Sequence, residues 1–351
     1  MKVYRVAAIC HGTSSALQSA KRVLPTPNGS AMDQPLVDVV IVSYNTAALL
    51  RACLRSLGVC RQLPLRILVV DNASHDGSAA MVREQFPHVE LIALDANLGF
   101  ASGTNHGLHQ IAHLPGAPAP YLLLLNPDTI VHPEALETMV AFLEAHPRVG
   151  LVGPRLLNPD GTPQAAAFRF PTLLMLFFDL FPPGELLPGR LYGSWWHGRY
   201  PEERGTEPFA IDHPLGACML VRRTTLAEVG PLDDRYFMYS EEVEWCWRIR
   251  RAGWAIWQVP TALITHVGGA ATSQFRHTMF VALWQSRDRF TAQYRPTWRL
   301  MLQRAIVRAG MVRLALVAWR AYLRGELSRQ ELQLRLLTYD RVRRDCRRVR
   351  A

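Results

Sequence analysis

Asp128 is the residue of this sequence that is placed most favourably for chemistry. It follows a short apolar run, Tyr121–Leu125, after only the dipeptide Asn126-Pro127. Such a run between turn residues is typical of a buried strand in a parallel sheet. Ligands bind beyond the carboxyl ends of such strands, where a carboxylate can hold a divalent metal against a diphosphate. Asn-Pro-Asp is equally an ordinary turn, so this segment alone leaves both interpretations open.

A second acidic pair, Glu241 and Glu242, stands at the predicted start of a helix, with Ser240 as its N-cap and Gly253 as its stop. Acids stabilise helix starts through the helix dipole, which is a purely structural interpretation. Aromatic residues surround the pair, however, at positions 236, 237, 239, 245 and 247. Partial desolvation among them raises a carboxylate pKa toward the range of a general base.

Two further features belong to the same region of the sequence. Glu244 and Arg248 are four residues apart, in the order that favours an ion pair on a helix. His266 ends a predicted strand and precedes Gly268-Gly269. A lone histidine is more often structural, and a metal-binding role for His266 depends on its convergence with Asp128.

Two polar segments follow predicted strands in the first half of the chain. Asp71–Ser78 carries two acids, Asp71 and Asp76, that could bind a base or ribose, although Asp, Asn and Ser also serve as helix caps and turns. The segment 97–107 places small residues at a helix start, which suits a phosphate or close helix–sheet packing. Its glycines recur every fourth residue, unlike the dinucleotide-binding fingerprint.

The elements that position these residues alternate between strand and helix. We predict strands at 37–45, with polar residues at its end, 65–71, 89–94 and 121–125, separated by helices at 46–57, 78–86, from 97 and 133–146, the last with Pro133 in its first turn. The pattern predicts a doubly wound, mostly parallel α/β sheet flanked by helices. Beyond residue 150 we expect a hairpin turn at 157–162, an aromatic insertion at 168–200, strands at 215–222 and 255–266, and a helix within 237–251.

The ends of the chain differ from its body. Residues 1–34 are rich in polar residues and proline and are expected to be disordered. Residues 275–351 hold 18 arginines, no lysine and 5 acidic residues, whereas the remainder is slightly acidic. This basic helical extension predicts an acidic partner: a membrane surface, nucleic acid or another protein. Within it, Met301–Tyr322 mixes arginine with large apolar residues, as an interfacial amphipathic helix or a solvated helical appendage would.

Composition also indicates the cellular compartment in which the protein is expected. The six cysteines show no metal-ligand spacing and suit a reducing environment rather than a disulfide framework. No apolar run approaches the length of a membrane-spanning helix, and the N-terminus is a poor secretory signal. We expect a cytoplasmic protein that is peripheral at the inner face of the membrane.

Taken in order, six segments resemble the family 2 glycosyltransferases, and most of all their bacterial rhamnosyltransferase-like branch. The resemblance covers residues 35–273 and is carried by residues 40–45, 69–78, 97–107, 125–128, 216–222 and 237–248. It implies a GT-A fold with a nucleotide-binding half at 35–150 and an acceptor half at 151–274. It also implies inverting transfer from a nucleoside diphosphate sugar with a divalent metal, Mg²⁺ or Mn²⁺.

The resemblance assigns roles to individual residues. Glu242 matches the catalytic base, and Asp128 with His266 the metal ligands. Glu241, Trp245 and Arg248 are expected to contact the acceptor or support the base. The positions expected to bind the nucleotide sugar are Ser43, Asn45, Asp71, Asp76, Asn97, Gly103, Asn105, Asn126 and Asp128.

Two positions depart from the family pattern: Asn126 replaces the first Asp of its D-x-D element, and Glu242 replaces an Asp. The chemistry agrees with the residues, because direct displacement needs one base for the acceptor hydroxyl and charge neutralisation on the leaving diphosphate. The paired acid and nucleophile of a glycosidase are not required.

We therefore expect transfer of a sugar such as rhamnose to a glycan or polyprenyl-linked acceptor in cell-surface polysaccharide synthesis. One alternative is a nucleotidyltransferase, although the loop Ser43–Thr46 lacks the glycine-rich, basic sequence that such enzymes use. Another is a non-enzymatic nucleic-acid binder that uses the arginine-rich extension. We expect no nucleic-acid partner, because the body has no excess of basic residues.

Overall fold

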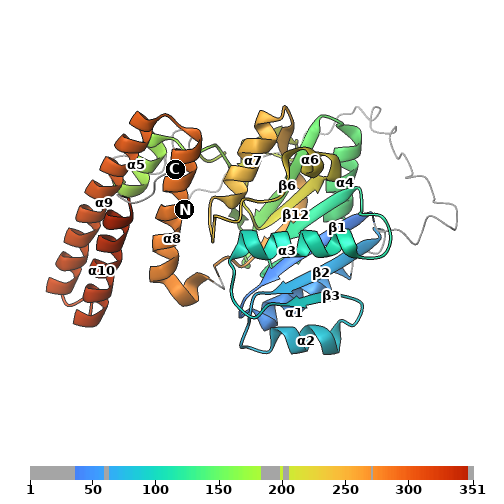
Figure 1. Ribbon diagram of the computed structural model, residues 1–351, viewed down its shortest axis with the longest axis horizontal. Coiled ribbons are helices and arrows are strands. Elements are labelled where there is room, and N and C mark those ends of the chain that lie inside the picture. The colour runs from blue at the N-terminus through green and yellow to red at the C-terminus, as the bar shows by residue number, and fades with distance from the viewer. Residues whose placement is uncertain (1–35, 59–62, 183–197, 201–204, 270–271, 347–351) are drawn as a thin grey trace, which may run out of the picture. The chain divides into compact units, whose positions relative to one another are not determined.

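The computed structural model describes residues 36–58, 63–182, 198–200, 205–269 and 272–346 (Figure 1). The predicted disordered segment 1–34 and part of the aromatic insertion, including Trp195 and Trp196, lie outside the described residues. Within the described part, no helix combines the length and the apolar composition needed to cross a bilayer.

A mixed sheet forms the centre of the fold, with the strand order β3-β2-β1-β4-β11-β6-β12-β5. The first four of these strands are parallel, β12 is parallel to β6, and β11 runs antiparallel between β4 and β6. This confirms the α/β fold class predicted from the sequence. The strands are β1 Val37–Ser43, β2 Leu65–Asp71, β3 Glu90–Ala93, β4 Tyr121–Leu125, β5 Thr129–Val131, β6 Val149–Leu157, β11 Cys218–Arg222 and β12 Ala255–His266.

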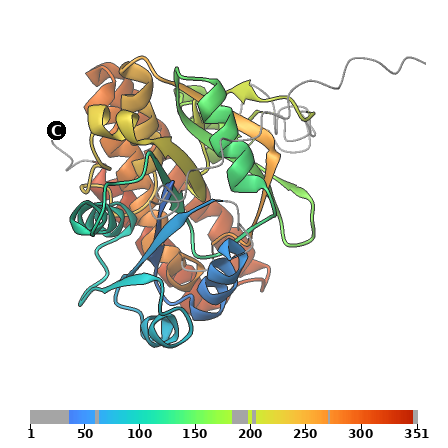
Figure 2. The same cartoon turned by 90° about the vertical axis from the view of Figure 1, so that its right-hand side faces the viewer.

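Helices cover both faces of the sheet (Figure 2). Alternate residues of β1 serve the two faces: Val39 and Ile41 belong to one apolar core, and Val40 and Val42 to the other. The first core includes residues of α1 Ala47–Leu57, α2 Ser78–Gln85 and α4 Ala135–Ala145. The second includes residues of α3 Phe100–His113, α6 Arg223–Val229 and α7 Glu241–Arg251.

One helix begins later than predicted. Pro133 was expected in the first turn of α4, but the helix starts at Ala135, with Glu134 at the N-cap in a left-handed conformation (φ 63°). The reason lies in β5, which pairs with β12 up to Val131. The chain has to reverse between that strand and α4, so residues 132–134 form the turn and not the helix.

The predicted hairpin turn at 157–162 is confirmed, because β6 pairs antiparallel with β7 Pro163–Gln164. The Asn158 backbone N–H donates to the Thr162 carbonyl at 2.8 Å across this turn. Strands of two or three residues leave no periodic pattern, so β5, β8 Ala167–Phe168, β9 Phe209–Ala210 and β10 His213–Pro214 were not predicted. The short helices α5 Leu173–Leu180 and α6 were not predicted either.

The basic extension is helical, as predicted, and consists of a short 3₁₀ turn η3 Thr272–Phe275 followed by α8 Arg276–Tyr294, α9 Thr297–Leu323 and α10 Arg329–Asp345. These helices share an apolar core with α5, and Figure 1 shows α5, α9 and α10 side by side. A smaller cluster joins Phe290 of α8 to Tyr236 and to Val243 of α7. The extension is thus packed against residues within 151–274 rather than extending from them.

Candidate functional site

A cavity of about 570 Å³, here called the central cavity, opens beyond the carboxyl ends of β1 and β4. Six of the residues expected to be functional line it, although they come from distant parts of the sequence. They are Asn97, Asn126, Asp128, Glu241, Glu242 and His266. The central expectation, that Asp128 and Glu242 face one cavity, is therefore met.

Asp128 and His266 lie side by side in this cavity. The His266 Nε2 is 3.4 Å from the Asp128 Oδ1, and both side chains are buried. The antiparallel pairing of β5 with β12 produces this approach, because it places His266 opposite Thr129, the residue after Asp128. The Val267 N–H also donates to the Asp128 carbonyl at 3.0 Å.

The pair has the chemistry of a metal site. The His266 Nδ1 lies 2.7 Å from the Gln164 Oε1. Donation to that oxygen leaves the Nε2 lone pair directed toward Asp128, as in histidines that ligate metals. Among the described residues no cluster of three or more histidine, cysteine or acidic ligands is found. Two protein ligands fit a cation that takes its remaining oxygens from a diphosphate and water. Gln164 was not foreseen from the sequence, because it belongs to a two-residue strand.

Glu241 and Glu242 follow a tight turn in which Tyr239 and Ser240 both have a left-handed backbone (φ 68° and 65°). Ser240 occupies the N-cap position as predicted, but its side chain makes no capping hydrogen bond. The turn is instead held from outside. The Ser286 hydroxyl of α8 donates to the Met238 carbonyl at 2.8 Å, and the Phe100 N–H of α3 donates to the Phe237 carbonyl at 2.9 Å. Such conformations persist only where the surroundings enforce them.

Burial raises the pKa of both carboxyls, as the aromatic flanks predicted. For Glu241 the pKa rises well above its ordinary value through burial and the neighbouring Glu242 charge. The Glu241 Oε2 is buried and makes no hydrogen bond. Burial also raises the pKa of Glu242, which retains some exposure. A raised pKa makes a carboxylate a stronger base, which is the direction that proton abstraction from a hydroxyl requires.

A second cavity, of about 280 Å³, adjoins the first and is called the arginine cavity here. Glu242, Leu215 and Tyr239 line both cavities, so Glu242 lies in the wall between them. The second cavity is formed mainly by α5, α8 and the start of α9. Its guanidinium groups belong to Arg169, Arg199, Arg287, Arg295 and Arg299.

The residues expected to bind the nucleoside form a hydrogen-bonded network beyond β1 and β2, outside the lining of the central cavity. The Asn45 N–H donates to the Ser74 hydroxyl (2.9 Å), and the Ala47 N–H donates to Asp76 (2.7 Å). Asp71 accepts from the Ser74 N–H at 3.0 Å, while its buried Oδ1 has no partner. The Ser43 hydroxyl bonds only locally, to that of Thr46, which lines the cavity.

Two residues expected at the nucleotide, Gly103 and Asn105, make close contacts within the protein. A Cβ on Gly103 would lie 2.9 Å from the Val42 Cγ1, so this glycine allows α3 to pack closely on β1. The Asn105 amide donates to the Leu232 carbonyl at 2.8 Å, and its oxygen accepts from the Leu232 N–H at 3.1 Å. Both polar ends of that side chain are therefore occupied.

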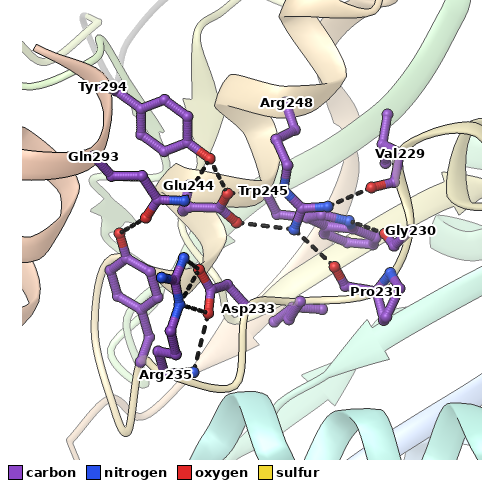
Figure 3. A network of polar contacts seen from close by, with 12 residues as sticks. Val229, Gly230, Pro231, Asp233, Arg235, Glu244, Trp245, Arg248, Gln293 and Tyr294 are labelled. Atoms are coloured by element: carbon purple, nitrogen blue, oxygen red, sulfur yellow. Dashed lines mark hydrogen bonds and ion pairs between the residues drawn. The ribbon is translucent and has the colours of Figure 1, made fainter. Parts of the chain in front are cut away.

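Trp245 and Arg248 likewise lie outside both cavities and fix the loop before α7 (Figure 3). The Trp245 Nε1–H donates to the Gly230 carbonyl at 2.9 Å. Arg248 pairs with both Glu244 oxygens at 2.8 Å, which confirms the predicted ion pair, and also donates to the carbonyl of Pro231. Tyr294 of α8 donates to Glu244 as well, which ties the extension to α7.

The structure adds several lining residues that the sequence reasoning missed. Asn72 donates to the Asn97 Oδ1 at 3.0 Å and accepts from the Leu98 N–H at 2.9 Å, so it shapes the loop that carries Asn97. Its position beside Asp71 was an available signal. Thr278 and Met279 of α8 also line the central cavity, and nothing in their sequence context indicated this.

The sequence is similar to a known protein family and to several curated proteins. It matches the family described as Glycosyl transferase family 2 over residues 38–230. It is 30% identical over 274 residues to an N-acetylglucosaminyl-diphospho-decaprenol L-rhamnosyltransferase of Mycobacterium tuberculosis, covering 75% of this chain and 86% of the relative. It is 27% identical over 227 residues to a low-salt glycan biosynthesis hexosyltransferase of Haloferax volcanii, covering 64% of this chain and 66% of that protein.

The fold has a solved counterpart in a mannosyltransferase of Pyrobaculum calidifontis in complex with GDP-Man and Mn²⁺. The TM-score is 0.51 at 17% sequence identity, over 88% of this chain and 87% of the other. That identity supports a shared fold of GT-A type and nothing finer. The family match covers more than half of the chain, and the mycobacterial relative aligns with three quarters of it, so the protein belongs to glycosyl transferase family 2 and is a glycosyltransferase of glycan synthesis.

Proposed function

We propose that the protein transfers rhamnose from a nucleoside diphosphate sugar to a lipid-linked acceptor, with Glu242 as the general base. The observation that carries this proposal is the position of Glu242 in the wall shared by the two cavities. A base in that wall can reach an acceptor hydroxyl on one side and direct it at a sugar carbon on the other. The choice of rhamnose and of a lipid-linked acceptor is supported by the name of the mycobacterial relative.

The donor belongs in the central cavity. Asp128 and His266 would hold a divalent ion, Mg²⁺ or Mn²⁺, which supplies positive charge for the departing diphosphate. Asp71 has a buried, unpartnered oxygen that can accept a hydrogen bond from the base or the ribose. Asn97 and Asn126 have side-chain amides at the wall of the central cavity. Glu242 takes the acceptor proton as the new glycosidic bond forms, so displacement occurs in one step with inversion.

A membrane location fits the outer surface of α9. Apolar side chains are exposed on one face of this helix, in one group near its start and another toward its end, and Val317 is exposed beside that face. The set comprises Trp298, Met301, Leu302, Val312, Leu316, Trp319 and Leu323, and the last of these is 77% exposed. The neighbouring arginines would attract anionic lipids. We therefore place the enzyme peripherally at the cytoplasmic face, where lipid-linked acceptors are elongated.

The first test is a screen of sugar nucleotides for thermal stabilisation of the protein with Mg²⁺ or Mn²⁺, because a ligand that binds only the native state raises its melting temperature. A nucleoside diphosphate rhamnose should give the largest shift, and Asp128→Ala should remove most of it. The matched control is Asp160→Ala, since Asn158-Pro159-Asp160 repeats the same tripeptide in an exposed hairpin. Equal stabilisation of the wild type and Asp128→Ala would refute the placement of the donor.

A further inference from the structure

We infer that the arginine cavity binds the diphosphate of the acceptor lipid, with Arg295 and Arg299 as its principal ligands. This inference rests on the proposed function, because it assigns the acceptor to the side of Glu242 opposite the donor. It goes further in naming the group that the cavity recognises and the two side chains that recognise it.

Charge is the first argument. Five arginines line this small cavity, against two acidic residues, Asp179 and Glu242. Arg287 is already paired with Asp179 at 3.0 Å. Within the described part of the chain, neither Arg295 nor Arg299 has a carboxylate at ion-pair distance. The cavity therefore holds an excess of positive charge that an anionic ligand would neutralise.

The environment of Arg295 strengthens the argument. This half-buried guanidinium stacks on Trp247, with its carbon 4.3 Å from the ring centroid. Burial and the Arg299 charge together lower the pKa of Arg295. Arg299 is exposed, and its charge beside the half-buried Arg295 costs free energy that an anion bound by both would offset. Planar guanidinium groups suit this task, since each can donate two parallel hydrogen bonds to phosphate oxygens.

Position is the second argument. Arg299 is the third residue of α9, so the positive end of a 27-residue helix dipole lies beside the same cavity. Glu242 lines the same cavity. A sugar that presents its hydroxyl to Glu242 can therefore place its anomeric diphosphate on the arginines. This is the order of groups in a diphospholipid-linked sugar.

The surface outside the cavity suits the lipid that follows the diphosphate. Leu173, Met175 and Leu176 of α5 line the cavity, and on the same helix Leu174 and Phe177 are exposed. Trp298 and Met301, on either side of Arg299, are 58% and 68% exposed. Exposed apolar residues of α5 and α9 thus adjoin a cavity that Arg295, after α8, and Arg299 of α9 line, as an amphiphilic acceptor requires.

The test compares two acceptors that carry the same sugar and the same short prenyl chain, one joined by a diphosphate and the other by an uncharged ether. Arg299→Gln and Arg295→Gln should each raise the KM for the diphosphate acceptor about tenfold, the loss expected for one charge-assisted hydrogen bond. The kcat and the donor KM should stay within about twofold. The KM for the uncharged acceptor should not change, and Arg295→Lys should restore part of the loss. Arg320→Gln, exposed on the same helix and outside the cavity, is the matched control.

A binding measurement separates this inference from the proposed function. Farnesyl diphosphate is titrated into the full chain in the presence of EDTA, so that no metal can recruit it to the central cavity. Binding to the wild type that is lost in the Arg295→Gln/Arg299→Gln double variant supports the inference, even if rhamnose is not the sugar transferred. Equal binding to both proteins overturns it, even if transfer occurs as proposed.

A third measurement distinguishes the acceptor from an ordinary lipid headgroup. Both proteins are tested for flotation with phosphatidylglycerol vesicles that contain no acceptor. We expect equal flotation, because the cavity would recognise a diphosphate and not a membrane surface. If the double variant loses vesicle binding as strongly as it loses farnesyl diphosphate, the arginines serve general membrane attachment and the inference is wrong.

Discussion

At the scale of single residues, the environment of a carboxylate decides its role more than its type does. Glu242 and Glu244 are two residues apart on α7, and both are largely withdrawn from water. Glu244 accepts hydrogen bonds from Arg248 and Tyr294, so its charge already has partners within the protein. Glu242 has no ion pair within the described residues and faces two cavities. Of these two carboxylates, only Glu242 lines a cavity that a substrate could enter.

Replacement of Glu242 by Gln tests this difference. We expect Glu242→Gln to lower kcat by about 10²–10⁴-fold, the usual contribution of a positioned general base. The dissociation constant of the donor, measured by calorimetry with metal, should change less than twofold. Glu244→Gln should instead lower the melting temperature, because it breaks a buried network. Loss of donor binding in Glu242→Gln would assign that residue a structural role.

Glu241 predicts a dependence of stability on pH. Its folded-state pKa lies well above the unfolded value, so its favourable contribution is complete below about pH 4.3 and is lost as the pH rises through the folded pKa. Above the folded pKa, the folded state holds a buried charge with an unpartnered oxygen. Glu241→Gln should therefore raise the melting temperature by roughly 1–3 °C at pH 8. The gain should shrink toward pH 4.5 in a thermal denaturation series, and a gain independent of pH would contradict this account.

At the scale of elements, the sequence predicted each strand that ends at the site but not how the strands meet. β1, β2, β4 and β12 were located almost to the residue, because long apolar runs fix them. The approach of His266 to Asp128 depends on β5, a strand of three residues. So short a strand has no periodicity, and its pairing across 133 positions is a tertiary property. For the same reason, the contribution of α8 to both cavities could not be predicted.

The helix α3 shows a second limit of sequence reasoning. Small residues at its start were compatible with phosphate binding or with close packing. Gly103 and Gly107 lie against Val42 and Val40, and a Cβ on either glycine would come within 3.0 Å of them. Only coordinates could separate these interpretations, because both require the same residue types. The contacts favour close packing as the role of these glycines. This packing positions the wall of the central cavity, because Val42 lines that cavity.

Gly103→Ala tests the packing role of this glycine. The added methyl would meet the Val42 Cγ1 at 2.9 Å and force α3 away from β1. We expect a loss of about 1–3 kcal/mol in unfolding free energy, as for other overpacked sites. Donor affinity should fall severalfold as a consequence. Ser102→Ala, the adjacent position on the same helix, is the control and should change neither quantity. Unchanged stability in Gly103→Ala would show that the helix tolerates the methyl.

At the scale of the whole chain, the C-terminal arginines have more than one task. Arg304 pairs with Asp288 at 2.7 Å and ties α9 to α8, and Arg313 donates to the Leu180 carbonyl at 3.0 Å and ties α9 to α5. Other arginines, including Arg320 and Arg324, are exposed near the end of α9. The net charge of this region therefore overstates the charge available to a partner. The arginines that remain exposed lie beside the exposed apolar residues of α9. This combination favours a membrane over nucleic acid as the partner of the extension.

The apolar stripe of α9 gives a prediction about membrane attachment. Leu316 and Leu323 are among its most exposed members, and neither lines a cavity. Leu316→Glu/Leu323→Glu should weaken flotation with phosphatidylglycerol vesicles at least about tenfold, because each leucine buried in lipid contributes more than 1 kcal/mol. Turnover of a water-soluble acceptor should be unchanged. Ala80→Glu, on the exposed face of α2, adds one acid far from α9 in the sequence and should float like the wild type. Flotation of the double variant equal to that of the wild type would exclude the stripe as the attachment surface.

Wild-type flotation should also weaken between 0.1 and 0.5 M salt, since salt screens the arginines but not the apolar contacts.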